Sequence, residues 1–307
     1  MPDLEERTLG RTGLKVTSLG YGAMELRGAP RGRPVTPEQA KDVLNAVLDA
    51  GINYIDTSID YGSSEEFIGE FISGRRSEYY LASKCGCMVG EAPAPERGDR
   101  YPHIYTRENV IAGVEQSLRR MKTSYIDVMQ FHGNPSKRTL QENGGLDAVI
   151  ELQRQGKVRF IGVSGTLPNL PEQIGMGVFD VFQIPYSALE RDHEVLAAEA
   201  GKAGAGVVIR GGVAKGAPSG QARRMGQWEA WQKAGIEELM EEGMTSMEFI
   251  LRFTLSHPEM DTTIVGTMNP EHLKANVAAA AKGPLPEDLY REARRRLDAA
   301  GITPTQS

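Results

Sequence analysis

The stretch from Thr106 to His132, TRENVIAGVEQSLRRMKTSYIDVMQFH, holds one complete unit of the pattern that decides the fold. A helical pattern covers about 107–121 and begins behind the capping residue Thr106. An apolar, β-rich run follows at Ile126–Phe131 and ends at a polar residue, His132. A helix joined to a short buried strand is the building unit of sheets whose strands run parallel.

The same alternation of strand and helix repeats along the chain. The strand patterns lie at Val16–Gly20, Tyr54–Ile55, Tyr79–Ser83, Ile126–Phe131, Val158–Val163, Val181–Ile184, Val207–Ile209 and Thr263–Val265. The helical patterns lie at about 37–50, 64–73, 107–121, 144–155, 169–175, 192–203, 245–256 and 270–281. These eight units, with no Pro- or Ser-rich linker between them, predict an α/β fold: a (β/α)8 TIM barrel built as a single domain over residues 1–307. No Gly-x-Gly-x-x-Gly follows the first strand, which disfavours a doubly wound dinucleotide-binding sheet.

Three segments stand outside this rhythm. Short β-prone runs around Gly10-Arg-Thr-Gly13 predict an N-terminal β-hairpin. The insertions Met88–Tyr105 and Ala214–Gly243 predict long βα loops over the C-terminal face, where barrels bind their substrates. Aromatic residues in these insertions either line a substrate pocket or pack the loops onto the barrel; they are Tyr101, His103, Tyr105, Trp228 and Trp231.

The composition narrows the range of partners. With 35 Lys and Arg against 41 Asp and Glu, the net charge of -6 offers no general attraction for nucleic acid or an anionic membrane. The N-terminus lacks the apolar core of a signal peptide, and no apolar run approaches the roughly 18 residues that a membrane span requires. We therefore expect a cytoplasmic protein that acts on a small molecule; the oligomeric state is not indicated.

The two cysteines, Cys85 and Cys87, form a C-x-C pair in a chain with no other cysteine. Such a pair does not make a disulfide framework, and the five scattered His residues do not supply a recognisable zinc pattern. We expect two reduced thiols near a strand end and no metal site.

Four polar residues follow the predicted strands closely enough to meet at one rim of the barrel. Asp56 follows Tyr54-Ile55, Tyr61 lies five residues later, Lys84 ends L-A-S-K, and His132 ends D-V-M-Q-F-H. A phenol with a pKa of about 10 is a weak acid unless a cation stabilises its anion. Lys84 can lower the pKa of Tyr61, Asp56 can orient Lys84, and His132 can bind a substrate oxygen, which predicts an acid-base site.

The motifs D-T-S-I-D-Y, A-S-K and Q-F-H resemble those of the aldo-keto reductase superfamily in order and strand context. The resemblance runs from L-G-R-T-G-L in the hairpin to G-T-M-N-P-E-H-L-K-A-N near the C-terminus. It implies that Asp56, Tyr61, Lys84 and His132 are the catalytic tetrad of an oxidoreductase that reduces an aldehyde or ketone, or oxidises the alcohol. It also implies NAD(P)H bound in an extended pose across the barrel mouth, without a Rossmann domain.

The resemblance further implies a set of cofactor-binding residues. Near the nicotinamide these are Gly22, Ala23, Met24, Asp56, Ser164 and Gln183, of which Ser164 and Gln183 hold the carboxamide. In V-I-R-G-G-V-A-K-G they are Arg210, Gly211, Val213 and Gly216. A clamp for the adenosine phosphate, at a helix N-terminus where backbone N–H groups favour anions, comprises Gly266, Thr267, His272 and Asn276.

Two positions depart from the family pattern. Arg210 stands where many relatives have an aromatic ring against the nicotinamide, so its charge is expected to disfavour NADP+ relative to NADPH, or to pair with a substrate carboxylate. Met268 stands where relatives are often basic, which weakens the case for NADP(H). Thr267, His272 and Lys274 still favour NADP(H), with NAD(H) as the alternative.

Two other functions fit the same residues. The barrel can be an NADP(H)-binding redox sensor that regulates a partner with little turnover. It can also be an epimerase or an eliminating enzyme that oxidises its substrate transiently, without net consumption of cofactor.

Overall fold

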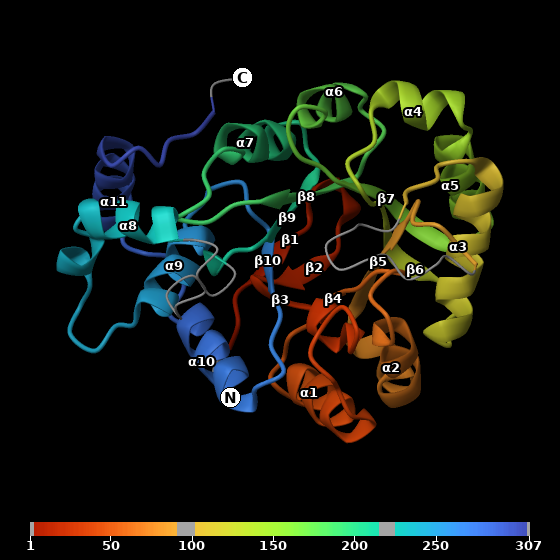
Figure 1. Ribbon diagram of the computed structural model, residues 1–307, viewed down its shortest axis with the longest axis horizontal. Coiled ribbons are helices and arrows are strands. Elements are labelled where there is room, and N and C mark those ends of the chain that lie inside the picture. The colour runs from red at the N-terminus through yellow and green to blue at the C-terminus, as the bar shows by residue number, and fades with distance from the viewer. Residues whose placement is uncertain (1–2, 91–101, 215–224, 306–307) are drawn as a thin grey trace.

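Eight parallel strands close into a barrel in the computed structural model, which describes residues 3–90, 102–214 and 225–305. Their order around the barrel is β10-β3-β4-β5-β6-β7-β8-β9, and each strand pairs in parallel with the next (Figure 1). The strands are β3 (Leu19–Gly22), β4 (Tyr54–Asp56), β5 (Tyr80–Cys85), β6 (Ile126–Phe131), β7 (Val158–Ser164), β8 (Val181–Pro185), β9 (Gly206–Arg210) and β10 (Thr262–Val265). The predicted (β/α)8 fold is confirmed.

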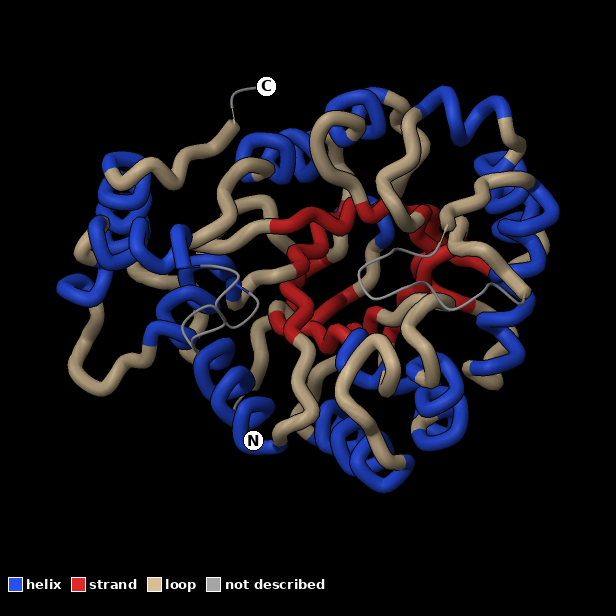
Figure 2. The backbone as a smooth tube through the Cα atoms, in the orientation of Figure 1, coloured by secondary structure: helices blue, strands red, loops and turns tan. Residues whose placement is uncertain are grey.

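Helices surround the ring of strands (Figure 2). The eight predicted helices form within one or two residues of their expected ends: α1 (Pro37–Asp49), α2 (Ser64–Phe71), α3 (Arg107–Arg120), α5 (Gly145–Arg154), α6 (Leu170–Gly175), α7 (Glu194–Lys202), α9 (Ser246–Leu255) and α10 (Pro270–Ala281). The sequence analysis did not anticipate α4 (Lys137–Glu142), α8 (Met225–Lys233) or α11 (Glu287–Ala299). In the part of the chain that the structure describes, no helix combines the length and the apolar character that a membrane span requires.

The predicted N-terminal hairpin is present. Strand β1 (Glu6–Thr8) pairs antiparallel with β2 (Lys15–Thr17), and a short 3-10 helix, η1 (Gly10–Thr12), connects them. Gly10 has a φ of +44°, and a Cβ atom there would lie 2.2 Å from the backbone nitrogen of Gly206. Because Gly10 has no side chain, the hairpin packs directly against the amino end of β9.

The first predicted strand, Val16–Gly20, is wrong as one element. It covers the end of β2 and the start of β3, which Ser18 separates. The backbone N–H of Ser18 donates to Glu5 in the hairpin, whereas its carbonyl accepts from Thr263 in the barrel. Ser18 therefore joins two sheets. The apolar pattern of the sequence is continuous across this bend, so the pattern does not show that the backbone passes from one sheet to the other.

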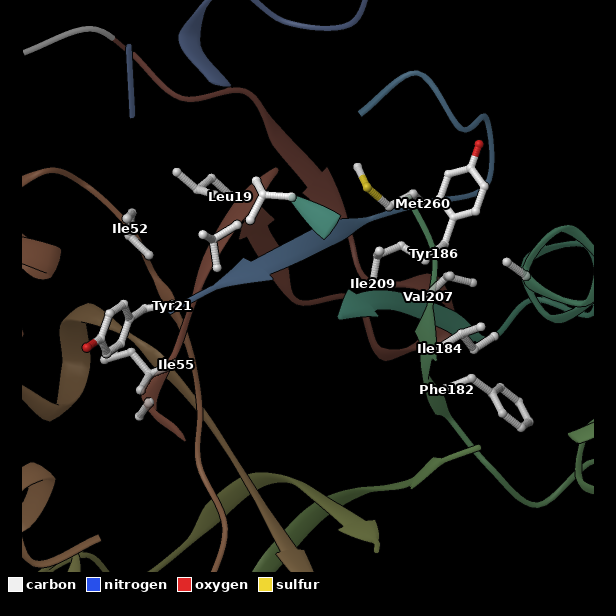
Figure 3. Packing of buried hydrophobic residues seen from close by; sticks show 14 of the residues in the cluster. Leu19, Tyr21, Ile52, Ile55, Phe182, Ile184, Tyr186, Val207, Ile209 and Met260 are labelled. Atoms are coloured by element: carbon white, nitrogen blue, oxygen red, sulfur yellow. The ribbon is translucent and has the colours of Figure 1, made fainter. Parts of the chain in front are cut away.

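Alternate residues of the strands face two separate cores. Tyr54, Val128 and Val208 lie inside the barrel, together with Leu9 and Val16 of the hairpin. Their neighbours in sequence, among them Ile55, Met129 and Ile209, join the larger core between strands and helices, part of which is shown in Figure 3. This period of two determines which polar residues reach the barrel mouth.

Candidate functional site

The inward-facing positions continue from the inner core to polar residues at the carboxyl ends of the strands. Two residues beyond Tyr54 on β4 lies Asp56, and two residues beyond Ala82 on β5 lies Lys84. The same step leads from Val128 to Gln130 on β6 and from Val181 to Gln183 on β8. Alternate residues of a strand point to the same side, so the residue two positions beyond each inner-core residue also faces the inside of the barrel. Each of these four strands thus places one polar side chain at the same point of the barrel mouth.

Asp56 and Lys84 form a buried ion pair at that point. Lys84 Nζ donates to Asp56 Oδ2 at 2.6 Å and to the carbonyl of Thr57 at 2.7 Å. Both side chains are almost inaccessible, at 1% for Lys84 and 3% for Asp56. Burial lowers the pKa of Lys84, but Asp56 and Tyr61 outweigh burial and raise that pKa above its usual value. Lys84 is therefore a fixed cation at neutral pH.

The second carboxylate oxygen of Asp56 is held by two amides. Gln130 Nε2 and Gln183 Nε2 each donate to Asp56 Oδ1 at 2.8 Å. With Lys84 on Oδ2, the carboxylate is bonded from three directions, which offsets the cost of its burial. The sequence analysis did not single out Gln130, although it shares the inward parity of His132 two residues later.

Tyr61 lies over the Lys84 ammonium. Lys84 Nζ is 4.9 Å from the centroid of the Tyr61 ring, and the rings of Tyr61 and His132 meet edge to face at 6.2 Å. Burial raises the pKa of the Tyr61 phenol above its usual value, while Lys84 acts in the opposite direction. Lys84 thus acts on the pKa of Tyr61 in the expected direction, but the net shift of that pKa is upward. Tyr61 is therefore a neutral phenol that can donate a proton.

His132 follows β6 and faces Asp60. Its Nδ1 lies 3.6 Å from Asp60 Oδ1 and 3.2 Å from the Sγ of Cys87. Burial lowers the pKa of His132 to about 3, and Lys84 adds to this effect, so the imidazole is neutral at pH 7. Ser58 donates to Asp60 at 2.5 Å, and Arg31 donates to the Asp60 carbonyl at 2.7 Å.

Asp60 is the second site residue that sequence reasoning missed. Burial raises its pKa, but the hydrogen bond from Ser58 and the cations Lys84 and Arg31 act against burial, and the pKa of Asp60 lies below its usual value. Asp60 directly precedes Tyr61 in D-T-S-I-D-Y, so its place in the motif was the available signal. Its carboxylate faces the Nδ1 side of the His132 ring.

The residues expected to bind the cofactor lie on the other strands. The tetrad belongs to three neighbouring strands: Asp56 lies on β4, Lys84 on β5, and His132 directly after β6. The other cofactor candidates lie on β7, β8, β9, β10 and β3 or in the segments that follow these strands. These five strands are consecutive around the closed barrel. Tetrad and cofactor candidates thus occupy two complementary arcs of the mouth.

Ser164 and Gln183 lie side by side at the ends of β7 and β8. They are paired in register, and the Ser164 hydroxyl donates to Gln183 Oε1 at 3.2 Å. Because Gln183 Nε2 binds Asp56, this amide connects the cofactor arc to the tetrad. Gly22 ends β3, and the next residues, Ala23 and Met24, begin the 3-10 helix η2 (Ala23–Arg27); Ala23 is buried and Met24 is 40% exposed.

The predicted phosphate clamp surrounds the N-terminus of α10. A Cβ atom on Gly266 would lie 2.5 Å from the carbonyl oxygen of Gly22, so two backbones meet closely there. Thr267 is buried, and its hydroxyl accepts from the Asn269 N–H at 3.0 Å. Asn269 caps the helix by accepting from the Glu271 N–H at 2.9 Å. The N-terminus of α10, where backbone N–H groups and the helix dipole favour an anion, is the feature of this region that suits a phosphate.

The other two clamp candidates, His272 and Asn276, and the non-basic residue Met268 are more exposed than Thr267. His272 is exposed and Asn276 half-buried on α10, while Met268 is half-buried in the preceding loop. Lys274 pairs with Glu271 at 2.9 Å on the surface of the same helix.

Arg210 ends β9, with the parity that faces the mouth, and is half-buried. Its charge is one of the smaller causes that lower the pKa of His132, after burial, Lys84 and His103. Gly211 follows in the left-handed region with a φ of +74°, and Val213 is buried. Gly216 lies outside the described residues.

The aromatic residues of the insertions divide between two roles. His103 and Tyr105 lie against His132: the His103 and His132 rings are 5.2 Å apart, and the Tyr105 hydroxyl donates to the His132 carbonyl at 2.5 Å. Trp231 is fully buried against Phe249 and belongs to the core, so it cannot line a pocket. Trp228 stacks on Trp231, and Tyr101 lies outside the described residues.

Comparisons with known proteins agree with this geometry. The sequence model of the Aldo/keto reductase family matches residues 18–296. The chain is 29% identical over 301 residues to the uncharacterized oxidoreductase YqkF of Bacillus subtilis, covering 93% of this chain and 94% of the relative. It is 27% identical to L-galactose dehydrogenase of Arabidopsis thaliana, covering 92% and 90%. The solved holo form of aldo-keto reductase AKR11C1 from Bacillus halodurans superposes with a TM-score of 0.83 at 26% identity, covering 96% of each chain.

Proposed function

The chain belongs to the aldo/keto reductase family, and we propose that it reduces an aldehyde or ketone to an alcohol with NADPH, with Tyr61 as the proton donor. Family and fold make it an oxidoreductase of the carbonyl or alcohol type. The observation that carries the finer proposal is the buried Asp56–Lys84 pair, whose ammonium lies 4.9 Å from the Tyr61 ring beside a neutral His132.

Each tetrad residue has a distinct task in this proposal. A reduced nicotinamide, when bound, supplies the hydride that goes to the carbonyl carbon. The negative charge that develops on the carbonyl oxygen is met by the Tyr61 proton, and the resulting phenolate is stabilised by Lys84. Neutral His132 accepts at Nδ1 from the Cys87 thiol and donates from Nε2 to the carbonyl oxygen, and Asp56 fixes Lys84 in place.

The cofactor candidates fit a dinucleotide by chemistry as well as by place. Ser164 and Gln183 offer a hydroxyl and an amide to a carboxamide. Thr267 and the capped end of α10 offer N–H groups and a hydroxyl to phosphate. His272 and Lys274 favour NADP(H) over NAD(H), because both are basic groups near that helix end.

Arg210 gives this site a feature of its own. In our proposal its guanidinium faces the nicotinamide, where a positive charge repels the oxidised, cationic ring and is neutral toward the reduced one. The enzyme would therefore hold NADPH more tightly than NADP+. A substrate carboxylate is the second group that Arg210 can bind.

The test is a carbonyl panel assayed with NADPH and with NADH, followed by the absorbance of the reduced nicotinamide. The panel includes aromatic aldehydes, keto acids and aldose sugars, the last because one relative is named L-galactose dehydrogenase. Tyr61→Phe should abolish most of the turnover and leave cofactor binding intact. Near-normal turnover in Tyr61→Phe would refute the proton-donor role, and tight cofactor binding with no turnover on any substrate would favour a redox sensor.

A further inference from the structure

Three metal-ligating side chains meet beside the tetrad. The ligand atoms of Cys87, His103 and His132 all lie within 4.8 Å of one another. Cys87 Sγ is 3.2 Å from His132 Nδ1, and the two imidazole rings meet edge to face with centroids 5.2 Å apart. Cys87 is buried and both His residues are half-buried, so the cluster is partly accessible through the two imidazole rings.

The backbone holds two of these ligands opposite each other. Cys87 and His103 form an antiparallel bridge, flanked by Met88 N–H to the Pro102 carbonyl at 3.0 Å and by Ile104 N–H to the Gly86 carbonyl at 2.6 Å. Residues opposite each other in such a bridge carry their side chains on the same face. The pair is therefore arranged before any ligand arrives, which lowers the entropic cost of binding.

Two further contacts fix this arrangement. The side-chain amide of Asn109 on α3 donates to the carbonyls of Cys87 and Ile104, at 2.9 and 2.8 Å. Gly133, with a φ of +82°, follows His132, and a Cβ atom there would lie 2.6 Å from Cδ2 of the His103 ring. The absence of a side chain at Gly133 is what lets the His103 ring approach His132.

We propose that Cys87, His103 and His132 form a Zn²⁺ site, and that a bound ion inhibits the oxidoreductase because it fixes the His132 ring toward Cys87 and His103 and away from the carbonyl oxygen. One thiolate and two imidazoles are a ligand set that zinc prefers, and three protein ligands leave a fourth position for water. On binding, the Cys87 S–H bond breaks, a Zn–S bond forms, and the proton passes to solvent. The metal site itself is independent of the proposed function; only the inhibition rests on it.

The experiment uses Co²⁺ as a spectroscopic substitute for Zn²⁺ on the metal-free, thiol-reduced full-length protein. A thiolate ligand gives a charge-transfer band, and tetrahedral geometry gives strong visible bands. We expect both bands in the wild type and their loss on addition of Zn²⁺. Cys87→Ser should lose the charge-transfer band and weaken Zn²⁺ binding by about 100-fold or more, since even outer-shell changes cost 10–100-fold.

Cys85→Ser is the matched control. Cys85 lies two residues earlier on β5, is equally buried, and belongs to the outer core rather than to the cluster. It should bind Co²⁺ and Zn²⁺ like the wild type, and thermal unfolding checks that both serine variants fold. His103→Gln should weaken Zn²⁺ binding without removing the thiolate band.

The ratio of reductase rates with and without Zn²⁺ tests the inhibition. This ratio should fall in the wild type and in Cys85→Ser, and stay near one in Cys87→Ser. No charge-transfer band in the wild type, or equal Zn²⁺ affinity of the Cys85 and Cys87 variants, would overturn the site. A correct cobalt spectrum in a protein that turns over no carbonyl would overturn the proposed function and leave the metal site standing.

Discussion

Lys84→Met removes a buried ammonium and keeps a side chain of similar length. The ammonium lies 4.9 Å from the centroid of the Tyr61 ring. At an effective dielectric constant of about 20, a unit charge at that separation is worth about 3.4 kcal/mol to a full negative charge on the ring. If the phenolate is fully formed in the transition state, kcat should fall about 300-fold; if it is half formed, about 20-fold.

The same substitution perturbs stability through Asp56. The carboxylate is 2% exposed and loses the cation that lies 2.6 Å from its Oδ2. Removing one partner of a buried ion pair costs about 3–5 kcal/mol, because the other charge stays buried. Urea unfolding of the single variant should show a loss of this size.

A double variant separates the two effects. In Lys84→Met combined with Asp56→Asn both charges are gone, so the loss of stability should be smaller than the sum of the single losses. The rate should stay as low as in Lys84→Met, because the phenolate still lacks its cation. Recovery of kcat together with stability in the double variant would show that Lys84 only supports the fold, and would refute the reasoning.

Three further predictions concern the remaining site residues. His132 has a folded-state pKa of about 3, so below about pH 6.5 the unfolded chain binds more protons than the folded one, and the stability from this group is lost as the pH falls. His132→Gln should remove about 2 kcal/mol of the decline in the free energy of unfolding between pH 7 and pH 5, measured by urea unfolding. An unchanged decline would contradict the neutral imidazole. Gly266→Ala should cost about 1–3 kcal/mol of stability, because the new Cβ would lie 2.5 Å from the Gly22 carbonyl oxygen. Gly22→Ala should be tolerated, because the nearest atom to its Cβ would be 3.7 Å away. Equal losses of stability in the two variants would argue against the close approach at Gly266. Arg210→Tyr should raise the affinity for NADP+ relative to NADPH in equilibrium titrations, and an unchanged ratio would exclude the redox bias.

The barrel could be predicted from sequence because parallel strands buried on both faces leave short apolar runs between helices. The prediction was wrong where one run crossed Ser18, since composition does not show that a backbone leaves one sheet and enters another. It was incomplete at α11, although Glu287–Ala299 carries an amphipathic pattern with Tyr290, Ala293 and Leu297 buried. A (β/α)8 barrel is complete with eight helices, so the fold itself does not require a helix in this segment.

The tetrad could be identified because its residue types follow strands and match a family motif. The side chains that bind the tetrad residues could not be predicted, because these contacts depend on distances across the barrel. Gln130 is one of the two amides on Asp56 Oδ1, and nothing in Q-F-H distinguishes it from a packing residue. The Cys87–His103 bridge depends on how an insertion folds back on itself, so the five His residues looked scattered in the sequence.

The two amides on Asp56 allow one more test, because they make the same bond to Asp56 Oδ1 from different strands. Gln130 and Gln183 each donate to Asp56 Oδ1 at 2.8 Å, so methionine at either position should cost about 1.5–3 kcal/mol of stability for the lost bond to a charged group, and more at Gln183, which also accepts from Ser164. Gln130 lies on β6 within the tetrad arc, whereas Gln183 also accepts from Ser164 in the cofactor arc. Gln183→Met should therefore lower kcat and also raise the Kd for NADPH, while Gln130→Met should lower kcat alone. Equal Kd values in the two variants would mean that the carboxamide is held elsewhere on the mouth.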